Sequence, residues 1–273
     1  MQTTLTTSLD MKAEKASARG LAALCEHYDL DVIQMGQLND LLSLLAEDER
    51  APTTVRAPAQ ALGVHLADSL SALEVASVRM AKSVADLGSG AGFPGLPLAI
   101  ALPSAKIHLV ESQARKCAFI EHAIVAAKLE NAQTAAHRAE DWVQGIGSHD
   151  VVLARALASQ PVVLEYAAPL MLMGGLLVDW RGRRDRSEEQ AARNAADILG
   201  LELLDIYRTE PFAGARDHHL HLYRKVRETP ELFPRRPGMA RKRPLGTPKA
   251  NRTRPESSTA VRDLRPRSTL ACQ

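Results

Sequence analysis

The stretch that decides the fold is Val84-Ala85-Asp86-Leu87-Gly88-Ser89-Gly90-Ala91-Gly92-Phe93-Pro94-Gly95, in which an apolar run leads directly into a glycine-rich turn. Glycine has no Cβ, so the backbone can turn sharply there and can approach a bound nucleotide closely. The residues from Phe93 to Leu102 have the length and the apolar spacing of a helix. The stretch therefore predicts a strand, a ligand-binding loop and a helix, in that order.

The rest of the chain after Lys82 repeats this alternation of short apolar runs and helical segments, which is typical of a parallel sheet with crossover helices. We expect a single main α/β domain, closed by two further strands. The predicted strands are SVADLG (83–88), KIHLVES (106–112), the run after Asn131, DVVLAR (150–155), GGLLVDW (174–180), LELLDIYR (201–208) and HHLHLYRK (218–225). The predicted covering helices are 93–102, 114–128, 160–172 and 187–199.

The N-terminal region has a helical rhythm instead. Between Ala16 and Glu47 apolar residues recur at helical spacing, which predicts a cap of two helices with a break near Met35-Gly36. The segment from Arg50 to Pro58 contains two prolines and predicts a connector into another helix, which carries His65 to Leu70.

The charge of the chain is distributed unevenly. The net charge is only +2, but residues 224–273 carry 14 Lys and Arg against 4 Asp and Glu. This basic C-terminal arm is suited to a polyanion, and nucleic acid is the first candidate. A solvated tail that keeps the protein soluble is the alternative.

Cysteines and apolar runs limit the other classes. Cys25, Cys117 and Cys272 are far apart and form no Cys-x-x-Cys pair, so we expect neither a disulfide framework nor a metal site, and a reducing cytoplasm as the compartment. The longest apolar run, Pro169 to Val178, is about half of the ~20 residues that a membrane span needs. We therefore expect a protein without a membrane anchor.

The glycine pattern distinguishes between cofactors. A nicotinamide site favours Gly-x-Gly-x-x-Gly, but the last of those positions is Phe93 here. The observed Gly-x-Gly-x-Gly resembles motif I of S-adenosylmethionine methyltransferases. A dinucleotide enzyme and a purely structural turn remain alternatives.

Acidic residues after the next two strands fit a nucleoside cofactor. Glu111 ends the second strand about 20 residues past the loop, where a carboxylate can accept hydrogen bonds from both ribose hydroxyls. Ala139-Glu140-Asp141 follows the third strand, where it can frame the adenine. The alternative for Glu111 is a helix-capping role before Ser112.

The residues after the fourth strand bear on the methyl acceptor. Asp150 to Ala156 is followed by no Asn- or Asp-Pro-Pro-aromatic motif, as amine methylation of adenine often shows, and Cys117 is best interpreted as a core residue rather than a nucleophile. A ring nitrogen such as guanine N7 has a free lone pair and needs no general base. Arg155 could position the cofactor carboxylate or the substrate base, and a surface ion pair is its alternative.

With these residues in view, the chain resembles the bacterial glucose-inhibited division protein B family, the small-subunit rRNA guanine-N7 methyltransferases, over about residues 60–246. The matching motifs are His65-x-x-Asp68-Ser69-Leu70, Asp86 to Leu98, Glu111-Ser112 with Arg115-Lys116 and Phe119, Arg138-Ala139-Glu140, Ala154-Arg155-Ala156, Glu165-Tyr166 with Pro169-Leu170 and Gly174-Gly175, and Pro234-Arg235-Arg236-Pro237-Gly238 running to Leu245.

The resemblance implies a Rossmann-type class I methyltransferase: a mainly parallel seven-stranded sheet with helices on both faces. It implies S-adenosylmethionine as cofactor and 16S rRNA or the small ribosomal subunit as partner, and we expect a monomer. With the residues above, the predicted cofactor contacts are Gly88, Gly90, Phe93, Glu111, Ala139, Glu140 and Arg155, and the predicted RNA contacts are Arg235, Arg236, Arg241, Lys242 and Arg243. A His and an Asp three apart on a helix, such as His65 and Asp68, are more often a structural polar pair.

The chain departs from the family in two places. Leu44 to Val55 lacks the Trp-Asn and Asn-Leu-Thr cluster that is usual there, and Arg181-Gly182 replaces Lys-Gly. The predicted organisation is a helical cap (1–60), a cofactor-binding domain (61–228), a basic RNA-contacting segment (229–246) and a disordered tail (247–273). The alternative functions are a methyltransferase for a small molecule or protein, a non-catalytic RNA-binding module, and a nicotinamide oxidoreductase.

Overall fold

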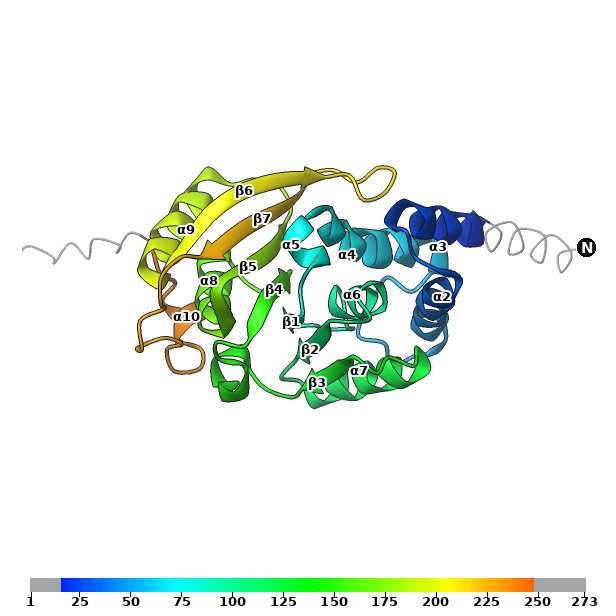
Figure 1. The fold of residues 1–273 in the computed structure, drawn as a ribbon, viewed down its shortest axis with the longest axis horizontal. Coiled ribbons are helices and arrows are strands. Elements are labelled where there is room, and N and C mark those ends of the chain that lie inside the picture. The colour runs from blue at the N-terminus through cyan, green and yellow to red at the C-terminus, as the bar shows by residue number, and fades with distance from the viewer. Residues whose placement is uncertain (1–15, 248–273) are drawn as a thin grey trace, which may run out of the picture.

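The computed structural model describes residues 16–247, and the rest of the predicted disordered tail lies outside them. The sheet has seven strands in the order β3-β2-β1-β4-β5-β7-β6 (Figure 1). Five strands are parallel, and β7 is antiparallel to both β5 and β6. The strands are β1 (Ser83–Leu87), β2 (Lys106–Val110), β3 (Ala132–Ala135), β4 (His149–Arg155), β5 (Met171–Arg181), β6 (Leu201–Thr209) and β7 (His218–Lys225). The predicted Rossmann-type sheet is confirmed.

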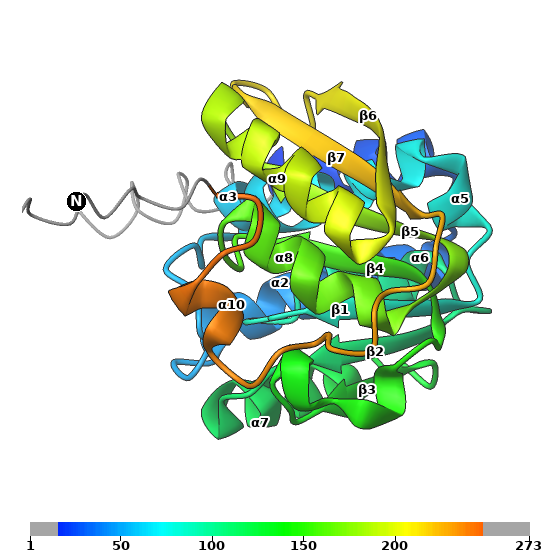
Figure 2. The same cartoon turned by 90° about the vertical axis from the view of Figure 1, so that its left-hand side faces the viewer.

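Helices cover both faces of the sheet, so the parallel strands are buried on two sides. The helices α6 (Gly95–Ala101), α7 (Ala114–Ala126) and α2 (Val32–Glu47) share one apolar core on the first face. On the other face lie α8 (Gln160–Ala167), α9 (Arg186–Leu199) and the short α10 (Met239–Lys242), which Figure 2 shows toward the viewer. Every predicted strand and covering helix is present, with ends that shift by a few residues.

The N-terminal cap differs from the prediction in where its first two helices separate. Residues 16–28 are helical, Asp29 takes a left-handed φ of 57°, and α2 then begins at Val32. Asp31 caps α2 reciprocally with Gln34, because its side chain accepts from the Ile33 and Gln34 amides while the Gln34 side chain accepts from the Asp31 amide. The predicted break at Met35-Gly36 is wrong, because these residues lie inside α2.

A second helical stretch connects the cap to β1. It consists of α3 (Pro58–Ala61), a π-helical turn η1 (Leu62–Ala67), α4 (Asp68–Leu70), a 3-10 turn η2 (Ser71–Glu74) and α5 (Ala76–Arg79). Leu66, Leu70 and Leu73 pack into the same core as α2 and α6. Asp68 of this stretch contacts Arg155 at the end of β4 and Trp180 near the end of β5, so the stretch lies over the carboxyl ends of these two strands.

None of the helices between residues 16 and 247 combines the length and the apolar composition needed to cross a bilayer.

Candidate active site

The glycine loop leaves β1 in backbone conformations that favour glycine. Gly88, Gly90 and Gly92 have φ values of 68°, 62° and 90°. A Cβ on Gly88 would lie 2.5 Å from the Leu157 side chain, so a larger residue there would have to displace that side chain. The Gly88 amide donates to the Val110 carbonyl at the end of β2 over 2.8 Å. The loop is therefore fixed against the ends of two neighbouring strands.

Asp86, two residues before the loop, fixes the start of α6. Its carboxylate accepts a hydrogen bond from the Gly95 amide over 3.0 Å. The side chain is fully buried, and burial raises the pKa of Asp86 to about 6. Asp86 thus has a structural role at the base of the loop, on the side of the sheet that faces α6.

A cavity of about 230 Å³ lies at the carboxyl ends of β1, β2, β3 and β4. This edge is where open α/β sheets bind their ligands. Four of the predicted cofactor residues line the cavity: Gly88, Glu111, Ala139 and Glu140. The other lining residues are Val110, Ser112, Gln113, Lys116, His137, Arg138, Ala156, Leu157, Tyr166 and Arg241. Gly90, Phe93 and Arg155 are absent from this lining.

Glu111 is the central carboxylate of the cavity and is 5% exposed. It accepts hydrogen bonds from the backbone amides of Ser112 and Gln113 at 2.8 and 2.9 Å, and from the Gly90 amide at 3.2 Å. A carboxylate offers about four acceptor positions, so roughly one remains for a ligand hydroxyl. The capping role weighed from the sequence is therefore present, and it leaves the carboxylate facing the cavity.

The rest of the cavity lining combines residues from distant segments. Glu140 accepts a hydrogen bond from the Gly238 amide over 3.0 Å, and the Arg241 side chain donates to the Leu157 carbonyl over 3.0 Å. Tyr166 reaches the cavity from α8, and burial raises the pKa of its hydroxyl. In the sequence Tyr166 belonged only to the Glu165-Tyr166 motif and Arg241 only to the predicted RNA contacts, and neither was predicted to line the cavity because neither follows a strand.

Ala156 also lines the cavity, directly after Arg155 at the end of β4. Its φ of 52° lies in the left-handed region that residues with a Cβ rarely adopt. Such strained positions concentrate at functional sites. The sequence motif containing Ala156 did not reveal this conformation.

Phe93 and Arg155 form a second cluster, which lies outside the cavity lining. Phe93 is 5% exposed, and its ring stacks on His65 with centroids 4.6 Å apart. The Arg155 guanidinium lies 6.0 Å from the Phe93 centroid and donates to Asp68 over 2.9 Å. His65 and Asp68 do not pair with each other, so the structural polar pair expected from the sequence is wrong. The π-helical turn between them changes the angular spacing that an α-helix would give.

The His65 ring is neutral in the folded protein. Its Nε2 lies 3.2 Å from the Val55 carbonyl, which can only accept, and 3.1 Å from the Thr53 hydroxyl, which can accept as well. We therefore assign the proton to Nε2, and Nδ1 is then a buried acceptor without a partner among the described residues. Burial, with Arg155 nearby, lowers the pKa of His65 to about 4. A second proton would be placed on Nδ1 beside the Phe93 ring, where residues 16–247 offer no acceptor.

We expect His65 to make the fold acid-sensitive. Its folded pKa of about 4 lies below the unfolded value of ~6.5, so the stability it contributes is complete above pH 6.5 and is lost as the pH falls to 4. The loss should reach about 2 to 3 kcal/mol. Urea unfolding of wild type and His65→Gln across this range measures it. If the two curves run parallel from pH 7 to pH 4, His65 is not the titrating group.

The family to which the chain belongs follows from sequence comparison. A family model described as rRNA small subunit methyltransferase G matches residues 34–216. The chain belongs to this family. Relatives named ribosomal RNA small subunit methyltransferase G include a protein of Desulfitobacterium hafniense, 37% identical over 71% of this chain and 81% of its own length. Another, from Syntrophomonas wolfei, is 40% identical over 66% of this chain and 85% of its own length.

A solved structure supports the fold alone. The mitomycin 7-O-methyltransferase MmcR is 16% identical, with a TM-score of 0.52 over 68% of this chain and 60% of that protein. The likeness supports the Rossmann-type fold, and family membership makes the chain a methyltransferase that uses S-adenosylmethionine.

The five residues predicted to contact RNA have different surroundings. Arg235 forms a two-bond ion pair with Glu165 of α8, which is 1% exposed. Arg241 lies at the cavity. The side chains of Arg236, Lys242 and Arg243 are exposed and make no side-chain hydrogen bond or ion pair within residues 16–247. Only these three have fully available charges.

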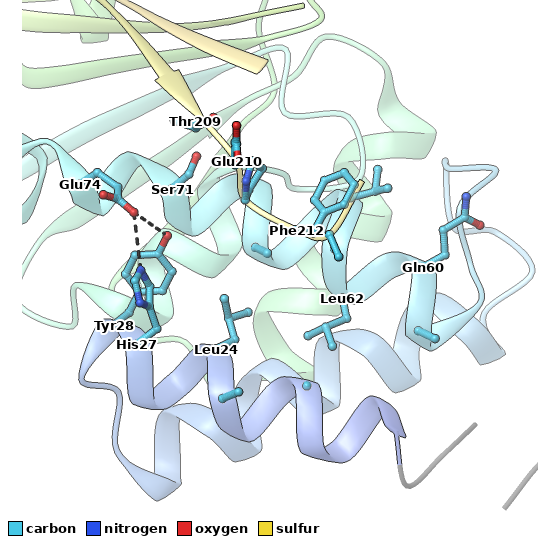
Figure 3. A pocket seen from close by; sticks show the side chains of 18 of the residues that line it. Leu24, His27, Tyr28, Gln60, Leu62, Ser71, Glu74, Thr209, Glu210 and Phe212 are labelled. Atoms are coloured by element: carbon cyan, nitrogen blue, oxygen red, sulfur yellow. Dashed lines mark hydrogen bonds and ion pairs between the residues drawn. The ribbon is translucent and has the colours of Figure 1, made fainter. Parts of the chain in front are cut away.

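A larger cavity of about 790 Å³ lies away from the glycine loop (Figure 3). It is lined by the helix of residues 16–28, the stretch 59–74 and the segment 207–213, which comprises the end of β6 and the residues that follow it. Glu74 lies at one end, where it accepts hydrogen bonds from Tyr28 at 3.4 Å and from Tyr207 at 3.3 Å. Most of the remaining lining is apolar, including Leu24, Leu62 and Phe212.

Proposed function

We propose that this enzyme transfers the methyl group of S-adenosylmethionine to N7 of a guanine in the RNA of the small ribosomal subunit. The observation that carries the proposal is the arrangement of Gly88 and Glu111 around one cavity at the carboxyl ends of β1 and β2. The family description names small-subunit rRNA as the substrate of its members. The guanine and its N7 come from the motif resemblance.

The residues of the cavity fit the nucleoside part of the cofactor. Glu111 has an acceptor position left for a ribose hydroxyl, and a hydrogen bond to a charged group contributes about 1.5 to 3 kcal/mol. Ala139 and Glu140 line the same space, where they would frame the adenine. Gly88 lines this space as well, with a backbone conformation that favours glycine.

The bound cofactor supplies a methyl group on a sulfonium, which makes the carbon electrophilic without help from a protein acid. Guanine N7 presents a lone pair, so the protein has to hold the base in line with that carbon and to exclude water. Arg155 is the candidate for holding either the O6 of the base or the cofactor carboxylate, since its guanidinium can donate two parallel hydrogen bonds.

The partner would be held through phosphates by the exposed residues Arg236, Lys242 and Arg243. Each phosphate contact to single-stranded RNA adds about −0.7 to the slope of log K against log salt. We expect each of the three alanine variants to reduce the magnitude of this slope by about 0.7. Filter binding to small-subunit RNA measures this slope between roughly 50 and 300 mM salt, a range that brackets physiological ionic strength.

The matched control for this series is Lys106→Ala. Lys106 is exposed at the first residue of β2, at the opposite edge of the sheet, and should leave the slope unchanged. A slope that stays constant in all three arm variants would mean that the arm does not meet phosphates.

The decisive experiment is transfer of labelled methyl to small ribosomal subunits purified from a strain that lacks this gene, followed by mapping of the modified base. The expected result is 7-methylguanosine at one position. Absence of label in both subunits and bare RNA, with normal cofactor binding, would favour a methyltransferase for a small molecule or protein. The proposal includes a monomer that acts in the cytoplasm, where ribosomal subunits are found; light scattering tests the first point.

A further inference from the structure

Asp68 joins three distant segments at the carboxyl edge of the sheet, although it is only 4% exposed. One carboxylate oxygen accepts from Arg155 of β4 at 2.9 Å, and the other lies 3.1 Å from Nδ1 of His218 on β7. Its backbone carbonyl accepts from the Trp180 indole of β5 over 3.0 Å. A carboxylate with such partners is rigidly placed.

The helical stretch around Asp68 provides a further hydrogen-bond acceptor at this edge of the sheet. The π-helical turn Leu62–Ala67 interrupts the α-helical hydrogen-bond ladder, and the Val64 carbonyl within it accepts a second hydrogen bond from Arg155 over 3.0 Å. π-Helical turns of this kind are frequent at functional sites. The stretch is thus attached to the sheet through side chains from the ends of β4 and β5.

Arg155 uses only part of its hydrogen-bond donors in these contacts. A guanidinium has five N–H donors, and both on Nη1 are used, by Val64 and Asp68. The three donors on Nε and Nη2 have no protein acceptor among residues 16–247. They form the edge of the guanidinium that binds a carboxylate or a carbonyl oxygen bidentately. Arg155 is held by one nitrogen and presents the others.

We propose that Asp68 and His218 are positioning residues of the methyl-transfer site, which hold Arg155 so that its Nε and Nη2 edge faces the cofactor or the guanine. The inference rests on the proposed function for the identity of that ligand. His218 acts through Asp68 by satisfying its second oxygen, and its ring is packed edge-on against Phe212 from the β6–β7 loop at 5.6 Å. The position of Arg155 is thereby linked to the loop that overhangs this edge.

The test is a double-mutant cycle between Asp68→Asn and Arg155→Ala, read in kcat/KM for RNA methylation and in Kd for S-adenosylhomocysteine. Misplacing a group by about 1 Å can cost roughly 100-fold in rate, so we expect Asp68→Asn alone to lose about 30- to 100-fold in whichever quantity Arg155→Ala changes. In the Arg155→Ala background the same substitution should cost less than about 3-fold, because coupled residues are not additive.

Three further variants separate positioning from folding. His218→Asn retains a donor near the Nδ1 position and should keep most of the activity, whereas His218→Ala should lose about 10-fold, a smaller loss than that of Asp68→Asn.

Glu189→Gln is the matched control, since Glu189 is also a nearly buried acid with an arginine partner, Arg184, but on α9. It should change the melting temperature without changing kcat/KM or Kd. If Asp68→Asn does not fold, the His218 pair carries the test.

Several outcomes would overturn the inference. These are full activity of folded Asp68→Asn, an undiminished loss in the Arg155→Ala background, or equal activity of His218→Ala and His218→Asn. If Arg155→Ala changes neither methylation nor affinity, the inference fails while the proposed function stands. If the wild type does not methylate rRNA, the proposed function fails, and the inference is then tested by S-adenosylhomocysteine affinity alone. It is overturned as well if the effects of Asp68→Asn and Arg155→Ala on that Kd are additive, or if Arg155→Ala leaves the Kd unchanged.

Discussion

Replacing Glu111 with alanine is expected to weaken the binding of S-adenosylhomocysteine at least about 100-fold. Glu111 lines the cavity while it holds the amides of Gly90, Ser112 and Gln113. Its removal would take away an acceptor for the ribose and would also release the glycine loop. Loss of a charge-assisted bond worth about 1.5 to 3 kcal/mol, together with a less ordered loop, corresponds to two orders of magnitude in Kd. Isothermal titration calorimetry measures this, and methyl transfer should fall with it.

Two variants separate the parts of this effect. Glu111→Gln keeps one acceptor oxygen and should bind the cofactor more tightly than Glu111→Ala. Glu121→Ala removes an exposed glutamate from the same region of the chain, on α7, and should leave Kd unchanged. If Glu111→Ala lowers only the melting temperature and retains normal affinity, Glu111 is a capping residue and the ribose contact has to be assigned elsewhere.

The fold could be predicted from the sequence because its signals are local. Each parallel strand is a short apolar run, and the loop from Gly88 to Gly92 requires left-handed conformations that glycine adopts at no cost. The same local logic explains the error in the cap. Gly36 suggested a helix break, but a glycine within a helix costs only about 1 kcal/mol, whereas the capping pair Asp31 and Gln34 sets the actual start of α2.

The site could be predicted only in part because several of its contacts join distant segments. Glu111 and Glu140 follow strands, so the parallel sheet places them at one edge. Asp68 and Arg155 are 87 residues apart, and Arg235 and Glu165 are 70 residues apart. No periodicity relates such positions. The π-helical turn also removed the expected pairing of His65 with Asp68, which rests on α-helical geometry.

Arg235→Ala is expected to destabilise the fold by about 3 kcal/mol, although the sequence predicted a phosphate contact for this residue. Both oxygens of Glu165 accept from Arg235, and Glu165 is 1% exposed, so the substitution leaves a buried carboxylate without its partner. Breaking a buried pair in this way costs about 3 to 5 kcal/mol, and the lower value applies because the Arg235 side chain is 20% exposed. Urea unfolding at pH 7 measures the change.

The neighbouring residue provides the control and the reason why the two arginines should differ. Arg236→Ala removes an exposed side chain and should change stability by less than about 0.5 kcal/mol while it lowers the salt slope of RNA binding. Arg235→Ala should do the reverse, and adding Glu165→Gln should restore part of the lost stability because the buried charge is then absent. Since Gly238 and Arg241 of the same segment contact Glu140 and Leu157, loosening it should also weaken cofactor binding several-fold. A stable Arg235→Ala protein with a reduced salt slope would instead place Arg235 on the RNA phosphates.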